Sequence, residues 1–233
     1  MFFEEFKTLV PTHPQLNPLL WAEDDHLRPE VRQQLLRIAK DFYRYVDVEF
    51  PVLDIVITGS NCNYNYTRAS DLDLHLITDY SELECDREAE ELFDSKRLLY
   101  EREYDIRIRN IPVTLYVEDR LNQRVSAGVY SVQSDQWLER PQHIQRSFDL
   151  AKIEKQIRMW RKLIKKATTS QDLTTARKTL KLLRTYRKEG LKTPQGEFST
   201  ANLVYKALRN DTTLAQLSDL VDRLHSQDLS IRN

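Results

Sequence analysis

The segment from Asp71 to Ile77 constrains the fold more than any other part of the chain, because it alternates strictly between polar and apolar residues. Side chains on a β-strand point alternately to opposite faces of a sheet. The alternation therefore predicts a strand that turns its three leucines toward a core. It also predicts that Asp71, Asp73 and His75 lie together on the opposite face.

A second predicted strand ends in a turn shortly before this one. Residues 52–58 are mostly apolar, Gly59 and Ser60 follow, and ten residues separate Ser60 from Asp71. Glycine lets the backbone approach a ligand closely, so the N–H groups of such a turn can face a polyphosphate. Two neighbouring carboxylates repel each other unless a cation lies between them, and Mg²⁺ commonly takes one or two carboxylates plus substrate phosphates. The pattern indicates Asp71 and Asp73 as metal ligands, and the alternative is an ordinary surface strand with a polar outer face.

The spacer 61–70 is rich in asparagine and tyrosine and contains one cation, Arg68. A guanidinium group suits phosphate, and an aromatic ring suits a nucleotide base. We therefore count Arg68 as a candidate substrate-binding residue, with Tyr64 and Tyr66 as weaker candidates for stacking. An ordinary loop is the alternative for this segment.

The remaining periodicity predicts an α/β (α+β) chain. Apolar residues that recur every three or four positions predict helices at 29–46 and 86–102. Alternation predicts a hairpin with arms 105–109 and 112–118, which turns at Asn110 and Ile111, and a short strand at 128–132.

Four predicted helices then follow one another, with Gly190 placed to cap the second of them. They occupy residues 149–167, 171–189, 197–209 and 213–225. We expect residues 1–147 to form the sheet-containing domain. We expect residues 148–233 to form a helical bundle, either as a second domain or as a layer on the first.

Charge is distributed unevenly along the chain. Residues 151–192 contain fourteen Lys or Arg and only three Asp or Glu, although the whole chain has a net charge of −1. Such an asymmetry favours a polyanionic partner, for which RNA (including tRNA) bound by the basic 152–192 helices is the natural choice. The candidate phosphate contacts on the first helix are Lys155, Arg158, Lys162, Lys165 and Lys166. A solvated helix face, or attraction between the two halves of the chain, would explain the same charges.

Cysteine content and hydropathy favour a cytoplasmic protein. The two cysteines, Cys62 and Cys85, lack the spacing of a metal site, and a disulfide between them is not expected in a reducing compartment. The first residues lack the basic and apolar regions of a signal peptide, and no apolar run approaches the ~18 residues of a membrane span. We expect no membrane partner.

The motif resembles the nucleotidyltransferase superfamily related to DNA polymerase β, whose signature is hydrophobic-Gly-Ser, about ten residues, then Asp-hydrophobic-Asp. The stretch 58–76 is similar to a subgroup of predicted nucleotidyltransferases that is found mainly in phage genomes. Two further stretches fit that subgroup, namely Gly128–Ser131 with Trp137, Leu138 and Pro141, and 187–209 with its Gly-Glu-Phe-Ser motif.

The resemblance implies a mixed-sheet core, Mg²⁺ (or Mn²⁺) and a nucleoside triphosphate. It implies transfer of a nucleotidyl group to a hydroxyl of RNA, tRNA, a protein or a small molecule, in the host cytoplasm if the protein is phage-encoded. By position, Asp71 and Asp73 would bind the metal and be catalytic, and Gly59 and Ser60 would bind the triphosphate.

The sequence departs from the subgroup at Thr114. A third carboxylate is expected there, in a Val-Glu-hydrophobic-Tyr-Val stretch, and this chain has Val-Thr-Leu-Tyr-Val. Thr114 would still line the substrate site, but its hydroxyl adds no charge and is a poor proton acceptor. Glu118 shares its face but lies about 13 Å farther along at ~3.3 Å per residue, and Asp105 lies on the neighbouring arm of the predicted hairpin.

Two functions are therefore compatible with the sequence. The first, which we favour, is an active nucleotidyltransferase. The second is a catalytically impaired module that keeps the pocket and binds a nucleotide, an RNA or a host protein.

Overall fold

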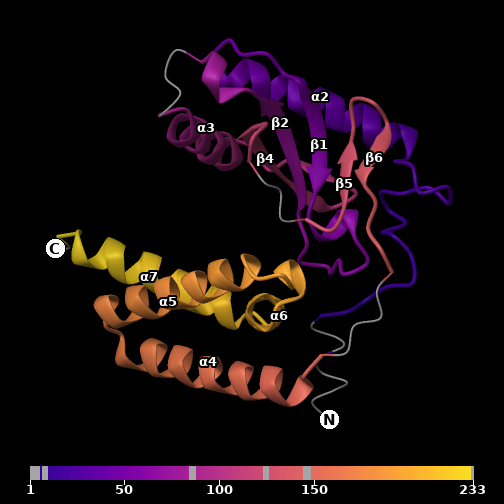
Figure 1. The fold of residues 1–233 in the computed structure, drawn as a ribbon. Coiled ribbons are helices and arrows are strands. Elements are labelled where there is room, and N and C mark those ends of the chain that lie inside the picture. Colours follow the sequence, from indigo (N-terminus) through magenta and orange to yellow (C-terminus); the bar gives the residue numbers. More distant parts are fainter. Residues whose placement is uncertain (1–5, 7–9, 84–87, 123–125, 144–147, 232–233) are drawn as a thin grey trace. The chain divides into compact units, whose positions relative to one another are not determined.

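The alternating segment 71–77 forms the strand β2 (Leu72–Thr78) near the centre of a six-stranded mixed sheet (Figure 1). The sheet order is β3-β4-β2-β1-β5-β6, in which β2 and β4 are parallel and the other neighbours are antiparallel. The other strands are β1 (Asp54–Thr58), β3 (Arg107–Ile108), β4 (Ile111–Asp119), β5 (Val129–Ser131) and β6 (Gln136–Glu139). The chain thus has the mixed α and β architecture that the sequence predicts.

This computed structural model describes residues 6, 10–83, 88–122, 126–143 and 148–231. The chain divides into two compact units, which we describe separately. One comprises Thr12–Ile144 and holds the sheet. The other comprises Met1–Pro11 with Gln145–Asn233 and holds the C-terminal helices.

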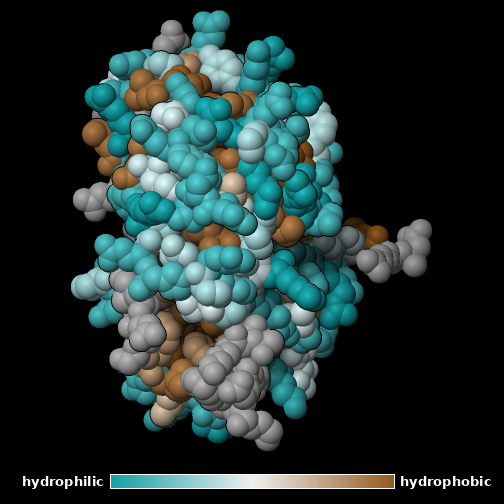
Figure 2. All heavy atoms as spheres, turned by 90° about the vertical axis from the view of Figure 1, so that its right-hand side faces the viewer, coloured by the Kyte–Doolittle hydropathy of each residue, from teal (hydrophilic) through white to brown (hydrophobic). Residues whose placement is uncertain are grey.

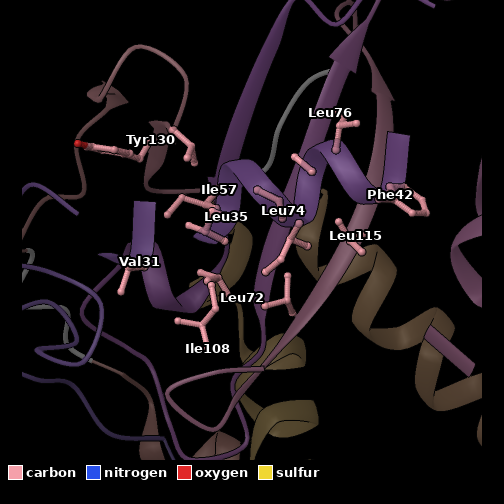
Figure 3. Packing of buried hydrophobic residues seen from close by; sticks show 14 of the residues in the cluster. Val31, Leu35, Phe42, Ile57, Leu72, Leu74, Leu76, Ile108, Leu115 and Tyr130 are labelled. Carbon is pink, nitrogen blue, oxygen red and sulfur yellow. The ribbon is translucent and has the colours of Figure 1, made fainter. Parts of the chain in front are cut away.

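One face of the sheet is covered by the helix α2 (Pro29–Val46). Proline at its first turn lacks the N–H group that a helix start leaves unsatisfied in any case. Figure 3 shows Leu35 and Phe42 of α2 in the same buried cluster as the leucines of β2, which are at most 1% exposed. The burial of these leucines confirms the faces predicted for β2, because Asp73 and His75 between them are only partly buried.

The helix α3 (Ala89–Glu103) connects β2 to the β3–β4 hairpin and packs against α2 and β4. The hairpin turns at Arg109 and Asn110, which both have positive φ, so the predicted turn at Asn110 and Ile111 was displaced by one residue. The first arm is also shorter than predicted, since β3 comprises only Arg107 and Ile108, although the N–H of Val113 also donates to the carbonyl of Ile106 at 3.0 Å.

The strand β6 was not predicted. Its side chains are mostly exposed, so the segment lacks the apolar alternation that marks a half-buried strand. Trp137 in β6 stacks on Trp21, with the ring centroids 4.6 Å apart, and its Nε1 donates to the carbonyl of Asp25 at 2.9 Å. The N-terminal segment therefore holds β6 in place.

The second unit is a helical bundle whose four helices share one apolar core (Figure 1). The helices are α4 (Leu150–Ser170), α5 (Leu173–Leu191), α6 (Thr200–Asn210) and α7 (Thr213–Asp228). Asp149, Asp172 and Ser199 cap the first three, because each side chain accepts a hydrogen bond from a backbone N–H of the first turn.

Gly190 does not cap α5 as predicted but lies within its last turn. A Cβ at this position would lie 2.5 Å from Ala201 Cβ, so the absence of a side chain lets α6 pack closely. Arg187 Nε donates to Asn202 Oδ1 at 3.1 Å, and its guanidinium lies over the ring of Tyr205. The motif at 187–209 thus joins α5 to α6.

The face drawn in Figure 2 shows mostly hydrophilic residues, with hydrophobic residues in small separate groups. Among the described residues, no helix has both the length and the apolar character needed to cross a membrane. Cys62 is a buried thiol, and Cys85 lies outside the described residues.

Candidate active site

Gly59 joins β1 to the short helix η1 (Ser60–Cys62) with a φ of +81°, in the region that favours glycine. The space beside it is taken by Asp73, because a Cβ on Gly59 would lie 2.2 Å from Asp73 Oδ2. Thr58 pairs with Asp73 across the antiparallel β1–β2 ladder. The structure therefore places the Gly-Ser turn directly against the second aspartate.

Hydrogen bonds fix the conformation of this turn. Ser60 Oγ donates to Ser70 Oγ at 2.8 Å, which ties the start of the spacer to its end. The backbone N–H of Gly59 donates to Ser126 Oγ at 3.2 Å. These contacts hold the two ends of the turn, and a phosphate that took the Gly59 N–H would replace a serine hydroxyl.

Gly128, the first residue of the 128–131 motif, packs against Cys62 in the short helix that follows Gly59. A Cβ on Gly128 would lie 1.9 Å from the carbonyl oxygen of Cys62, so only glycine allows the two backbones to approach this closely. Ser126 Oγ donates to the carbonyl of Gly128 at 2.8 Å. The sequence marked Gly128 as part of a motif without a role, and Ser126 carried no signal because its contact with Gly59 spans 67 residues.

Asp71, Asp73 and Thr114 come together at the same level of the sheet. Asp73 is the register partner of Thr114 across the parallel β2–β4 pair, and Thr114 Oγ1 donates to Asp71 Oδ2 at 3.5 Å. The carbonyl of Asp71 accepts a hydrogen bond from Asn61 Nδ2 at 2.7 Å. Both carboxylates are partly buried, so they are fixed in position yet accessible to a ligand.

The donor set suits Mg²⁺ shared with a substrate. Among the residues that the structure describes, no group of three or more His, Cys, Asp or Glu side chains is arranged to hold a metal ion. Two carboxylates with an adjacent hydroxyl match the way Mg²⁺ binds beside a triphosphate, where phosphate oxygens and water complete the octahedron. Asp71 and Asp73 are therefore the residues that could hold such an ion, with water and a nucleotide supplying further oxygen ligands.

His75 lies one step farther along the same face of β2. Its Nε2 lies 3.1 Å from Thr58 Oγ1, and its Nδ1 lies at ion-pair distance, 3.0 Å, from Glu118 Oε2. Its ring stacks on Tyr116 with centroids 4.6 Å apart. Burial, and then the nearby charge of Asp73, raise the pKa of Tyr116 above its ordinary value, so the phenol stays neutral.

The two carboxylates considered as replacements for the third acid have cationic or imidazole partners of their own. Glu118 pairs in register with Ile77, four residues beyond Asp73, and lies against His75. Asp105 is exposed and accepts a hydrogen bond from Arg107 Nε at 2.9 Å.

A different acid, Glu101 of α3, lies beside β4 next to Thr114. Its Oε1 accepts the backbone N–H of Leu115 at 3.3 Å, and its Oε2 pairs with Arg97. No local pattern marked Glu101, because only the packing of α3 against the edge of β4 brings it there.

The spacer residues occupy two different settings. Tyr64 stacks on His143 and Tyr66 stacks on His13, each with centroids 3.9 Å apart, so in this structure both tyrosines pack against imidazoles of the same unit. Arg68 is exposed at the tip of the spacer and forms no ion pair or hydrogen bond with any other described residue. Of the spacer candidates, Arg68 therefore has the more accessible side chain.

Comparisons with known proteins add little to this description. No protein-family model matches the chain, and no curated protein matches it. Among solved structures, the STING-associated CdnE c-di-GMP synthase from Capnocytophaga granulosa is similar at 15% sequence identity and a TM-score of 0.21. The match covers 87% of this chain and 84% of that one. A likeness this weak carries no information about what this chain does.

Proposed function

We propose that this protein is a nucleotidyltransferase that uses Mg²⁺ or Mn²⁺ and a nucleoside triphosphate. One observation carries the proposal: Asp71, directly before β2, and Asp73, within β2, lie beside a Gly-Ser turn, and Gly59 lies directly against Asp73. The carboxylates would hold the ion, and the turn would receive the triphosphate. RNA is the acceptor class that the basic bundle favours.

The proposed reaction exchanges a phosphoanhydride bond for a phosphate ester bond. The acceptor oxygen bonds to the α-phosphorus, the bond from this phosphorus to the bridging oxygen breaks, and pyrophosphate leaves. We assign the hydroxyl proton to solvent, because Thr114 cannot accept it. When bound, the ion neutralises charge that develops on the phosphates.

The residues of the chain contribute mainly position and shape. Asp71 is oriented by the Thr114 hydroxyl, and its backbone by Asn61. Gly59 leaves room for the Asp73 carboxylate. Phosphoryl-type transfer depends mainly on such positioning and on charge stabilisation, so these contacts are the ones that matter.

A second candidate function follows from Thr114 itself. Thr114 is the register partner of Asp73, and the resemblance to nucleotidyltransferases implies a third carboxylate at this position. Without that carboxylate, the pocket could bind a nucleotide and serve as a sensor, or present the protein to a host partner, without turnover.

The test is a screen of each common NTP with Mg²⁺ or Mn²⁺, measuring pyrophosphate release in the presence of total RNA or total protein. We expect release with one acceptor fraction, and loss of release in Asp73→Asn. Asp222→Asn is the control, because it removes one carboxylate at an exposed position on α7, in the helical unit. Nucleotide-dependent thermal stabilisation without pyrophosphate would favour the binding module, and the absence of both would reject both functions.

A further inference from the structure

Four cations form a row along one face of α5. Arg177, Lys181, Arg184 and Lys188 follow one another at intervals of four, three and four residues, which places them on the same side of a helix. All four are exposed. At ~1.5 Å per residue, the row extends over about 17 Å.

These side chains surround a hollow rather than a convex surface. The hollow has a volume of about 450 Å³ and lies between α5 and α7, with Leu180 and Val221 among its lining residues. It therefore combines a cationic rim with a small aliphatic floor. It lies wholly within the helical unit, whereas the aspartate site belongs to the unit that holds the sheet.

The charges of this row are not compensated within the described part of the protein. None of the four cations has an ion pair or hydrogen bond with another described residue. By contrast, Arg161 in the same bundle donates to Asp211 at 2.7 Å, and the single glutamate of α5, Glu189, pairs with Lys192. Like charges three or four residues apart on a helix repel each other, so an anionic ligand would relieve this repulsion.

We propose that the four cations and the hollow that they surround, together called the α5 basic row, bind single-stranded RNA. Evenly spaced cations match a backbone that carries one charge per nucleotide, and the aliphatic floor can receive the face of a base. An acidic protein is the less suitable partner, because protein interfaces concentrate aromatic anchors that this hollow lacks. The choice of RNA over DNA rests on the proposed function, in which RNA supplies the acceptor hydroxyl.

The helices α4 and α5 differ in how they present their charge, although both are rich in cations. On α4, the exposed lysines are interleaved with exposed Met159 and Leu163, and Arg158 pairs with Glu154 at 3.5 Å. Charge alone would favour both helices. The exposed side chains of Lys162 and Lys165 on α4 also lack a partner among the described residues, so the hollow is what makes α5 the binding surface.

The test measures fluorescence anisotropy of a labelled mixed-sequence single-stranded RNA with the full chain. The double variant Lys181→Glu/Arg184→Glu should weaken binding at least about tenfold, and should reduce the slope of log affinity against log salt by about 1.4, which corresponds to two lost phosphate contacts. The matched control is Lys162→Glu/Lys165→Glu on α4, which makes the same change in net charge and should lose less than about threefold. Circular dichroism would verify that both variants are folded.

Three results would overturn the inference: no binding by the unaltered protein, equal losses in the two double variants, or displacement of the RNA by an acidic peptide at equal charge concentration. Its failure is separable from failure of the proposed function. Asp73→Asn should bind the labelled RNA as tightly as the unaltered protein does, whereas it should lose pyrophosphate release. RNA binding without pyrophosphate release would support the α5 basic row and reject the catalytic proposal. Pyrophosphate release without RNA binding would support the catalytic proposal and reject the α5 basic row.

Discussion

Thr114 faces Asp73 across the parallel β2–β4 pair, and its hydroxyl lies 3.5 Å from Asp71 Oδ2. The residue that interrupts the expected set of three carboxylates is therefore a hydrogen-bond donor to the first of them. In the absence of a cation, such a donor stabilises a carboxylate that a third negative charge would destabilise.

Replacing this donor by an acid is the sharpest test of the site. We expect Thr114→Glu to raise pyrophosphate release at least about tenfold, because the new carboxylate would complete a two-metal set. Thr114→Gln has the same length without the charge and should give no increase. If the two variants release pyrophosphate equally, the missing carboxylate is not what limits turnover.

The same variant should make stability depend on the ion. Three carboxylates in one site repel one another, so the melting temperature of Thr114→Glu should fall below that of the unaltered protein in EDTA. Mg²⁺ with a triphosphate should recover most of the difference. Thermal unfolding with and without the ion checks this, and a drop that Mg²⁺ and triphosphate leave unchanged would indicate misfolding rather than charge repulsion.

Gly59→Ala should damage both the fold and the nucleotide site. Its Cβ would lie 2.2 Å from Asp73 Oδ2, and the positive φ adds backbone strain. We expect a loss of about 1–3 kcal/mol in the free energy of unfolding and loss of nucleotide-dependent stabilisation.

The control for this glycine is Gly196→Ala in the helical unit, where φ is +50°. It carries a similar backbone cost but does not belong to the unit that holds Asp73, so it should lose stability and keep nucleotide binding. Urea unfolding gives the first quantity for both variants, and thermal shift with NTP gives the second. Equal nucleotide binding by the two would contradict the role given to Gly59.

His75 should prove to be a positioning residue rather than a proton-transfer residue. It lies between Thr58 and Glu118 and stacks on Tyr116, so its contacts are with the protein. We expect His75→Gln to lower the free energy of unfolding by about 1–3 kcal/mol. Pyrophosphate release per folded molecule should fall less than about tenfold, whereas loss of a general acid or base costs about 10²–10⁴.

Asp79 should make stability depend on acid pH. Its hydrogen bond from the Ser81 hydroxyl holds the pKa of this carboxyl below its ordinary value of 3.8, and Arg120 adds to the effect. A lowered pKa in the folded state contributes stability that is present above the unfolded value and is lost as the pH falls through the folded value. Asp79→Asn should therefore be destabilising at neutral pH, with a difference from the unaltered protein that shrinks below about pH 4.

Urea unfolding across this pH range measures that difference. Asp222→Asn, at an exposed position on α7, should show no comparable trend. A difference that stays constant with pH would mean that the Asp79 contacts act through packing and not through ionisation.

Much of this protein could be predicted from local patterns. The leucine–polar alternation of β2 fixed which side chains would be buried, because strand geometry allows only two faces. The apolar periodicity of α2 and of the C-terminal segments predicted helices for the same reason. Gly59, Ser60 and the aspartate pair were predicted as neighbours from their positions on two successive strands, and the antiparallel β1–β2 pair brings them together.

Features that the sequence could not determine depend on contacts between distant segments. Pairing of β2 with β4 requires the chain to cross over through α3, so no local signal sets the register that places Thr114 opposite Asp73. The same holds for Glu101 beside Leu115, and for Ser126 on the Gly59 amide. The sequence by itself determined which residue types stand at the positions proposed to bind a metal and a phosphate. Only tertiary packing decided which neighbours those residues have, because sequence periodicity describes one element at a time.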